Sequence, residues 1–477
     1  MDLITSWDEF IIDIDFNKIN KIKKNIDDEN SLEGMRVRTF LKNYMKKIIP
    51  DLKSFIKYNS RCNQAPSQQY YSEDNGLRCG LFYDKNYNDS IQLNITIGST
   101  WGGGIFIKDN ENLIFGNQEL LKNLQKQYPK FIFSKKQQHI FAIKFKNNIL
   151  SNGNETLKSI CDLSNILEIM IRETKMQEKI NLLKNRNQII LQGPPGTGKT
   201  RLAKQMAIRM TNNTDPIETN DEIKASLENI GSNQVKLIQF HPSYSYEDFV
   251  RGIVATTTNN GNGIKYETKN KVLVDMANNA YAELNDKGYY KTNDKEERKT
   301  ILENSDKYIL IIDEINRANL SSVLGELIYA LEYRDEAVES MYALKGGSRE
   351  ITLPSNLYII GTMNTADRSI GHIDYAIRRR FAFESVLPEI DIIKDTDAKK
   401  KYEEVEGFFS DKYLSPEFEK DRVMLGHSYF IAEDKKELEE KLKYQVIPLL
   451  EEYVSDGILI DSEKLRKEIK KLNESNS

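Results

Sequence analysis

A glycine-rich run that ends in a lysine and a threonine is the best candidate for chemistry in this sequence of 477 residues. The stretch Gln192–Thr200 reads QGPPGTGKT and fits the pattern G-x-x-x-x-G-K-[ST], which binds the phosphates of a nucleoside triphosphate. Glycines let backbone N–H groups converge on phosphate oxygens, Lys199 supplies a point charge, and the Thr200 hydroxyl ligates Mg²⁺. The residues expected to bind the nucleotide are Gly193, Pro194, Pro195, Gly196, Thr197, Gly198, Lys199, Thr200 and Arg201.

Two carboxylates follow a second apolar run. Residues 308–312 read YILII, which is typical of a buried strand, and Asp313 and Glu314 come directly after it. An apolar run followed by Asp-Glu is a weak signal alone, but here it follows a phosphate-binding loop within an alternating pattern of strands and helices. We expect Asp313 to hold Mg²⁺, directly or through water, and Glu314 to orient and deprotonate the attacking water.

An asparagine and three arginines are the remaining candidates for catalysis. Asn364 ends another apolar run, where its side chain can lie between the γ-phosphate and the lytic water; alternatively, it caps the following turn. Arg378, Arg379 and Arg380 stand just before the last predicted strand. Arginines there cannot easily reach the nucleotide of their own subunit. We therefore expect Arg379 or Arg380 to act on a neighbour's nucleotide as an arginine finger, with a basic surface patch as the alternative.

These side chains must be brought together by a sheet. From Gln188 onward short apolar runs alternate with helical patterns, which predicts an α/β fold with a parallel sheet and helices on both faces. The predicted strands are 188–191, 235–240, 308–312, 357–362 and 381–384, separated by polar insertions at 211–232, 256–268 and 285–306. The nucleotide-binding domain is expected at 187–385, between a helical linker at 151–186 and a helical lid at 386–477.

The first 150 residues are expected to form a different, smaller domain. Short β-type runs separated by turn residues predict an α+β domain over residues 1–150. Basic residues crowd residues 36–61, which suits contact with DNA phosphates or simply a solvated helix face. The loop Thr100–Gly104 is a candidate contact, and aromatic side chains here could stack on a base or fill a core: Tyr58, Tyr70, Tyr71, Tyr83, Tyr87 and Trp101.

Composition narrows the class of protein. The net charge of −4 is uneven, because residues 1–150 are net basic and the rest net acidic. No apolar run is long enough to span a bilayer, and the N-terminus has no signal-peptide pattern, so we expect a cytoplasmic protein without a membrane partner. The three cysteines and four histidines are scattered, which argues against a zinc site and a disulfide framework.

Several motifs together resemble the AAA+ subunit McrB of modified-cytosine restriction systems, over roughly residues 175–460. Beside the phosphate loop they are DEINRA at 313–318, MNTADRS at 363–369, FHPSYSYEDF at 240–249, GHSYF at 426–430 and IPLLEEY at 447–453. The resemblance implies an AAA+ fold with a helical lid, and a homo-oligomeric ring, a hexamer in this family, that hydrolyses GTP with Mg²⁺. It also implies a McrC-type nuclease partner and action on modified or foreign DNA.

The resemblance leaves alternatives open. GTP is implied by the family alone, since the chain has no ordinary Asn-Lys-x-Asp guanine motif, and ATP is the alternative substrate. A MoxR-like ATPase that remodels protein partners shares the same nucleotide core and is the alternative function. His241 and His427 lie within the family-like motifs, and we expect both to be hydrogen-bonded structural histidines.

Overall fold

The computed structural model describes residues 71–72, 76–82, 91–97, 103–109, 114–115, 118–135, 139–144, 153–212, 219–257, 264–367 and 373–472. Contacts within the chain divide it into two compact units, Met1–Gln177 and Glu178–Ser477. The basic stretch 36–61, the loop around Trp101, and Arg368 and Ser369 of the MNTADRS motif lie outside the described residues. Of the aromatic candidates, Tyr58, Tyr70, Tyr83 and Tyr87 lie outside them too.

The first unit contains an antiparallel sheet and a short helix. The strands lie in the order β1-β2-β3-β4-β6-β5, and every pairing between neighbours is antiparallel. Helix α4 (Gln118–Gln127) buries Leu120 and Leu124, which lie four positions apart on one face. The strands are β1 (Tyr71–Ser72), β2 (Gly76–Phe82), β3 (Ile91–Ile97), β4 (Gly103–Asp109), β5 (Ile132–Ser134) and β6 (His139–Lys144).

The second unit is built on the predicted parallel sheet. Helix α5 (Gly153–Arg186), which crosses the division between the units, ends two residues before the first strand. All pairings in the sheet are parallel and the strand order is β15-β7-β14-β11-β8, which confirms the α/β prediction. The strands are β7 (Gln188–Gly193), β8 (Val235–Gln239), β11 (Tyr308–Asp313), β14 (Leu357–Asn364) and β15 (Ala382–Ser385).

Both faces of the three central strands, β7, β14 and β11, are buried, which explains their near-continuous apolar sequences. On β11, Leu310 and Ile312 belong to one core cluster with the buried side of helix α9 (Val272–Asp286). Ile309 and Ile311 alternate with them, so they point to the opposite face and are equally buried. Helix α6 (Lys199–Asn212), which starts at the phosphate-binding loop, packs against β7, β11 and β14.

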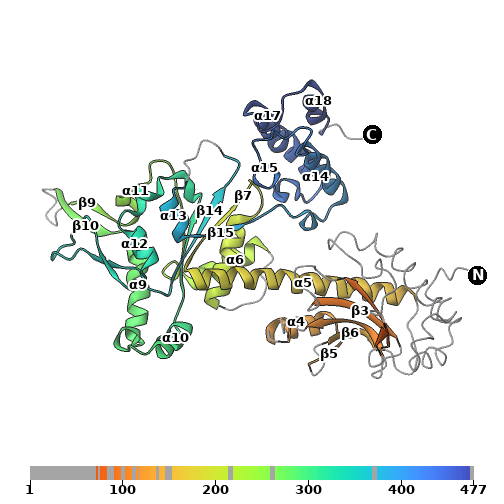
Figure 1. Ribbon diagram of the computed structural model, residues 1–477, viewed down its shortest axis with the longest axis horizontal. Coiled ribbons are helices and arrows are strands. Elements are labelled where there is room, and N and C mark those ends of the chain that lie inside the picture. Colours follow the sequence, from red (N-terminus) through yellow and green to blue (C-terminus); the bar gives the residue numbers. More distant parts are fainter. Residues whose placement is uncertain are drawn as a thin grey trace, which may run out of the picture. The chain divides into compact units, whose positions relative to one another are not determined.

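The polar insertions contain regular elements that periodicity did not predict. The first holds α7 (Asn220–Ile230), where Thr219 and Glu222 form a reciprocal capping box. The second is largely a hairpin of β9 (Arg251–Thr257) and β10 (Ile264–Asn270), which projects as a ribbon in Figure 1. The third holds η5 (Tyr289–Lys291) and α10 (Lys295–Glu303). Capping side chains, which a search for apolar periods overlooks, start two of these helices.

Short elements connect the strands on the side of the sheet that carries α9. They bring the chain from β8 to the hairpin and from β11 to β15, and several belong to the same core cluster. They are α8 (Tyr246–Phe249), η6 (Ile315–Arg317), α11 (Leu320–Leu324), α12 (Leu327–Glu332), β12 (Ala337–Glu339), β13 (Glu350–Thr352) and α13 (Tyr375–Arg380).

The described residues after β15, up to residue 472, form a helical lid with its own apolar core, drawn in blue in Figure 1. Its elements are η7 (Ile390–Ile392), α14 (Thr396–Phe408), α15 (Lys420–Val423), η8 (His427–Phe430), α16 (Lys435–Lys441), η9 (Leu442–Val446), α17 (Ile447–Ser455) and α18 (Glu463–Lys471). Among the described residues, no helix is both long and apolar enough to cross a membrane.

Candidate nucleotide-binding site

The glycine-rich run forms the turn between β7 and α6. Gly196 and Gly198 have φ angles of 79° and 81°, a region that residues with a side chain rarely adopt. The Thr197 hydroxyl donates to the Pro194 carbonyl at 3.1 Å and closes the loop on itself. The backbone therefore takes the path that a phosphate-binding loop at a helix N-terminus requires.

The lid rests directly on this loop. Gly426 N donates to the Pro195 carbonyl at 2.8 Å, and Ser428 N donates to the Gly196 carbonyl at 3.0 Å. A methyl group on Gly426 would lie only 2.0 Å from the carbonyl carbon of Gly196, so no side chain fits there. The lid thus binds two carbonyls of the loop through its own backbone amides.

Lys199 is held at the mouth of the loop. Its Nζ donates to the carbonyls of Gly193 at 3.0 Å and Pro194 at 2.7 Å. Burial lowers the pKa of Lys199 to about 8, while Glu314 and Asp313 act in the opposite direction. The ammonium is therefore charged at neutral pH and poorly solvated, which strengthens its attraction for an anion.

Oxygen atoms that suit Mg²⁺ meet beside the lysine. Asp313 Oδ1 accepts hydrogen bonds from the hydroxyls of Thr200 and Thr362, each at 2.6 Å. A carboxylate and a hydroxyl fit Mg²⁺, which prefers oxygen ligands and completes its shell with water and nucleotide phosphates. In the described part of the chain, no group of three or more His, Cys, Asp or Glu side chains is placed to hold a metal ion.

Thr362 is a site residue that sequence reasoning missed. It lies on β14, where parallel pairing brings Gly361 opposite Ile312, and it is buried. Its hydroxyl also accepts from the Glu314 amide at 3.1 Å. The one usable signal was a threonine inside an otherwise apolar strand, just before Asn364. Thr362 fixes both carboxylate residues of the DEINRA motif relative to β14.

Glu314 occupies a strained, half-buried position. Its φ of 52° is left-handed, a rare conformation for a residue with a side chain and one that concentrates at functional sites. Its Oε2 is buried without a hydrogen-bond partner in the described structure, and Arg317 Nε lies 3.5 Å from it in an ion pair. Arg317 also lies 3.7 Å from Asp367 Oδ2. Sequence reasoning gave no role to Arg317, which links these two acids.

Asn364 lies at the end of β14, beside the β7 residue Gly193 in the parallel register. Its Oδ1 accepts from the Ala366 amide at 3.2 Å, so the asparagine does cap the following turn. That bond orients the carboxamide and leaves its NH₂ group as the part suited to donate to a water or a phosphate. The capping role and the expected sensor role are therefore compatible.

The three consecutive arginines differ sharply in their surroundings. The guanidinium of Arg378 lies over the Phe383 ring, 5.1 Å from its centroid. Arg380 is 15% exposed and forms a 2.9 Å ion pair with Glu332, whereas Arg379 is 75% exposed and lies 4.0 Å from the same carboxylate. Arg379 alone of the three can reach outward without breaking a close contact, so it fits a finger better than Arg380.

The two histidines of the family-like motifs have different environments. His427 is buried, and its Nδ1 accepts from the Glu389 amide at 3.1 Å, so the neutral ring carries its hydrogen on Nε2. Burial lowers the pKa of His427 and favours this neutral form. A methyl group on Gly198 would lie 3.8 Å from Nε2, so the ring adjoins the loop. His241 is exposed and contacts the edge of the Tyr244 ring.

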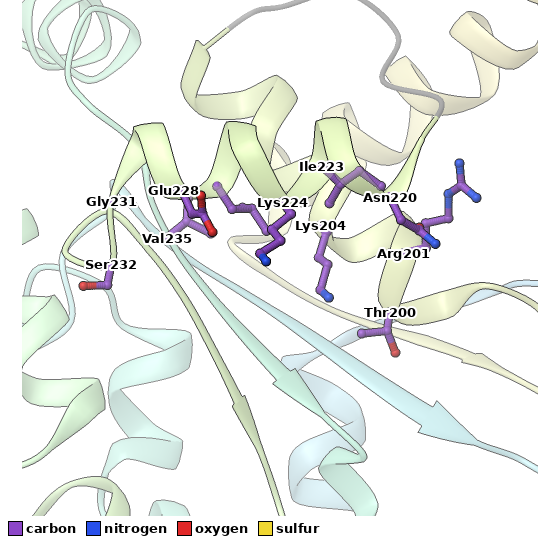
Figure 2. Close-up of a pocket in the computed structure, with 11 residues that line it drawn as sticks. Thr200, Arg201, Lys204, Asn220, Ile223, Lys224, Glu228, Gly231, Ser232 and Val235 are labelled. Atoms are coloured by element: carbon purple, nitrogen blue, oxygen red, sulfur yellow. The ribbon is translucent and has the colours of Figure 1, made fainter.

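A pocket of about 610 Å³ opens beside the loop, between α6, α7 and β8. Figure 2 shows Thr200 and Arg201 at one end, Lys204 and Lys224 in the middle, and Ser232 at the other end. Sequence reasoning did not predict this pocket, because it depends on the fold of the 211–232 insertion. Its apolar side includes Ile223, Leu227 and Val235.

Two segments of the second unit match models of known protein families. Residues 188–381 match the AAA domain of the dynein-related subfamily, and residues 416–466 match the α-helical lid domain of McrB. These matches agree with the predicted AAA+ core and helical lid.

Two curated relatives belong to restriction systems. The type IV methyl-directed restriction enzyme EcoKMcrB subunit of Escherichia coli (strain K12) is 34% identical over 321 residues, which cover 63% of this chain and 61% of that protein. The type II restriction enzyme BsuMI component YdiS of Bacillus subtilis (strain 168) is 37% identical over 99 residues, 18% of this chain and 29% of that protein. The chain thus spans less than two thirds of either relative.

Solved structures add little. NtrX from Brucella abortus is 12% identical, and the match has a TM-score of 0.25 and covers 68% of this chain and 76% of the NtrX chain. So low a score carries no weight beside the matches of the AAA domain and the lid.

Proposed function

The chain is an McrB-like AAA+ protein over its AAA domain and lid, and from that premise we propose that it is the GTP-hydrolysing motor subunit of a restriction system. An AAA domain implies a nucleotide hydrolase. The choice of GTP, the partner nuclease and the action on DNA are the parts that we propose. In this proposal the subunit drives a McrC-like nuclease and does not cut DNA itself.

The observation that carries the hydrolase assignment is the meeting of three strand ends. The phosphate loop at the end of β7, Asp313 and Glu314 at the end of β11, and Asn364 at the end of β14 lie at the same edge of the sheet. Direct bonds join Thr200, Asp313 and Thr362 there. Phosphoryl transfer needs mainly such positioning of charges around the γ-phosphate and the water.

Each residue then has a proposed task. Lys199 and the loop amides bind the phosphates, and Thr200 and Asp313 hold Mg²⁺, which neutralises phosphate charge when bound. Glu314 accepts the proton of the attacking water, and Arg317 keeps the carboxylate in place through their ion pair. Asn364 orients the water or the γ-phosphate through its NH₂ group. Arg379 completes the site of the neighbouring subunit.

Glu314→Gln should bind nucleotide and assemble as the wild type does, yet turn over about 10²–10⁴-fold more slowly, because the amide keeps the shape and removes the base. The rate is measured as phosphate release at saturating nucleotide. Glu339→Gln, an exposed change on β12, is the matched control and should leave the rate unchanged. Near wild-type turnover in Glu314→Gln would assign the base to another residue.

The proposed function is tested by hydrolysis of GTP and of ATP, each with and without DNA and with the partner nuclease subunit. The proposal expects GTP to give the higher kcat/KM and the partner to stimulate turnover. A ring that prefers ATP and ignores both DNA and the nuclease, but responds to a protein client, would favour the MoxR-like alternative. The lid match and both curated relatives support the restriction reading.

Oligomerisation is part of the same proposal. A finger in trans requires a ring or at least a dimer in which one subunit's α13 approaches the next subunit's phosphate loop. The exposed position of Arg379 supports this arrangement. We propose a homo-oligomeric ring, a hexamer by resemblance to the family, whose mass in solution with and without nucleotide is directly measurable.

A further inference from the structure

Gln188, the first residue of β7, uses every polar atom of its side chain inside the protein. It is 3% exposed. Its Nε2 donates to the Arg380 carbonyl at the end of α13 at 2.7 Å and to the Leu331 carbonyl of α12 at 3.0 Å. Its Oε1 accepts from Arg334 Nη2 at 2.6 Å. One side chain therefore joins the strand that leads into the phosphate loop to two helices.

Arg334 extends this cluster to the neighbouring strand. Its Nη1 donates to the carbonyls of Leu357 at 3.1 Å and Pro354 at 3.4 Å, around the start of β14. Burial lowers the pKa of Arg334 to about 10, so the guanidinium stays charged at neutral pH. Because hydrogen bonds of buried groups are costly to leave unmade, this cluster resists rearrangement.

The helix held by Gln188 carries the exposed arginine and is too short to be stable alone. Helix α13 spans six residues, far fewer than an isolated helix needs. Arg380 fixes it to α12, donating from Nε to the Ile328 carbonyl at 2.7 Å and pairing with Glu332 at 2.9 Å. Arg380 therefore works within its own subunit, and the direction of Arg379 depends on how α13 is anchored.

We infer that Gln188 is a positioning residue that connects α13 to the phosphate-loop strand β7. Through this connection, the nucleotide site of one subunit controls the orientation of that subunit's Arg379 towards the neighbouring subunit. The inference rests on the proposed action of Arg379 in trans. The mechanical route is short, because β7 runs from Gln188 to Gly193, the first glycine of the loop. A shift of this strand is passed to α13 through a bond of 2.7 Å.

Gln188→Glu tests this role with little change of shape. The carboxylate still accepts from Arg334 but can no longer donate to the carbonyls of Leu331 and Arg380. Nucleotide affinity and ring formation should stay at wild-type values, and kcat should fall by about 10²-fold, the effect of a small misplacement of a catalytic group. A wild-type kcat in a folded Gln188→Glu protein would overturn the inference.

Mixed rings separate this role from a general structural one. With Lys199→Ala, which lacks a working loop but has a sound finger, Gln188→Glu should regain activity. With Arg379→Ala, which has a sound loop but no finger, it should not. The inference would be overturned if activity recovered in the mixture with Arg379→Ala but not in the mixture with Lys199→Ala, or if it recovered in neither mixture. In both cases the damage would lie in the phosphate loop of the Gln188 variant.

Two controls keep the outcome interpretable. Mixing Lys199→Ala with Arg379→Ala tests the finger in trans by itself, so its failure would count against the proposed function and not specifically against Gln188. Should Gln188→Glu not fold, as thermal melting would show, Gln188→Met removes the same two donors without adding a charge. The same pattern of recovery is expected of it, and the opposite pattern would again refute the role.

Discussion

Lys199→Ala is expected to abolish nucleotide binding at concentrations that saturate the wild-type protein. The ammonium is half-buried at the mouth of the loop, and its pKa of about 8 leaves it charged at neutral pH. Removing one partner of such a desolvated charge pair costs about 2–5 kcal/mol. That loss weakens the affinity by about 30-fold to several thousand-fold. Titration of a fluorescent GTP or ATP analogue measures it directly.

The control for this variant must remove a lysine without touching the site. Lys295→Ala changes the exposed first residue of α10 and should bind nucleotide as the wild type does. Thermal melting of both variants, without nucleotide, reports whether the fold is kept. Wild-type affinity in a folded Lys199→Ala protein would refute the assignment of the phosphate loop.

Arg379→Ala is expected to leave nucleotide binding intact and to lower hydrolysis by about 10³-fold or more, the scale of arginine fingers. The side chain is 75% exposed and its ion-pair contact with Glu332 is 4.0 Å long, so its removal should barely affect the stability of the subunit. The effect should therefore appear in kcat. Phosphate release and nucleotide binding are measured on the same preparation.

The neighbouring arginines serve as controls. Arg378→Ala removes the same charge one residue away, but its guanidinium lies over Phe383 within the subunit, so we expect a small change in kcat. Arg380→Ala breaks the contacts with Ile328 and Glu332 and should lower the melting temperature as well as the rate. A stable Arg379→Ala protein with wild-type turnover would remove the finger role from this residue.

The mixture of Arg379→Ala with Lys199→Ala decides whether the arginine acts in trans. One variant contributes an intact loop and the other an intact arginine, so a mixed ring contains some complete sites. Activity above that of either parent is the expected result. If mixed rings form, as shown by co-purification of two tags, and remain inactive, the arginine acts within its own subunit or only stabilises the interface.

The sheet of the second unit could be predicted from the sequence because the patterns that indicate its strands are local. The three central strands, β7, β11 and β14, are short and nearly continuous apolar runs, as strands buried on both faces must be, and the chemical groups come at or directly after their ends. For the phosphate loop, Asp313 and Glu314, the local sequence therefore predicts both the chemical group and its position at a strand end. The insertions were less accessible, since α7 and α10 depend on capping residues and lack a long apolar stripe.

By itself the sequence determined an α/β nucleotide-binding core, the helical character of the lid and the identity of the groups around the phosphate loop. Only the tertiary structure decided that Arg379 is exposed while Arg380 is held by Glu332, that Thr362 joins Asp313, and that Gly426 contacts the loop. The reason is physical. Residue type and spacing fix local chemistry, whereas burial and hydrogen-bond partners arise between segments far apart in the chain, such as Gln188 and Arg380.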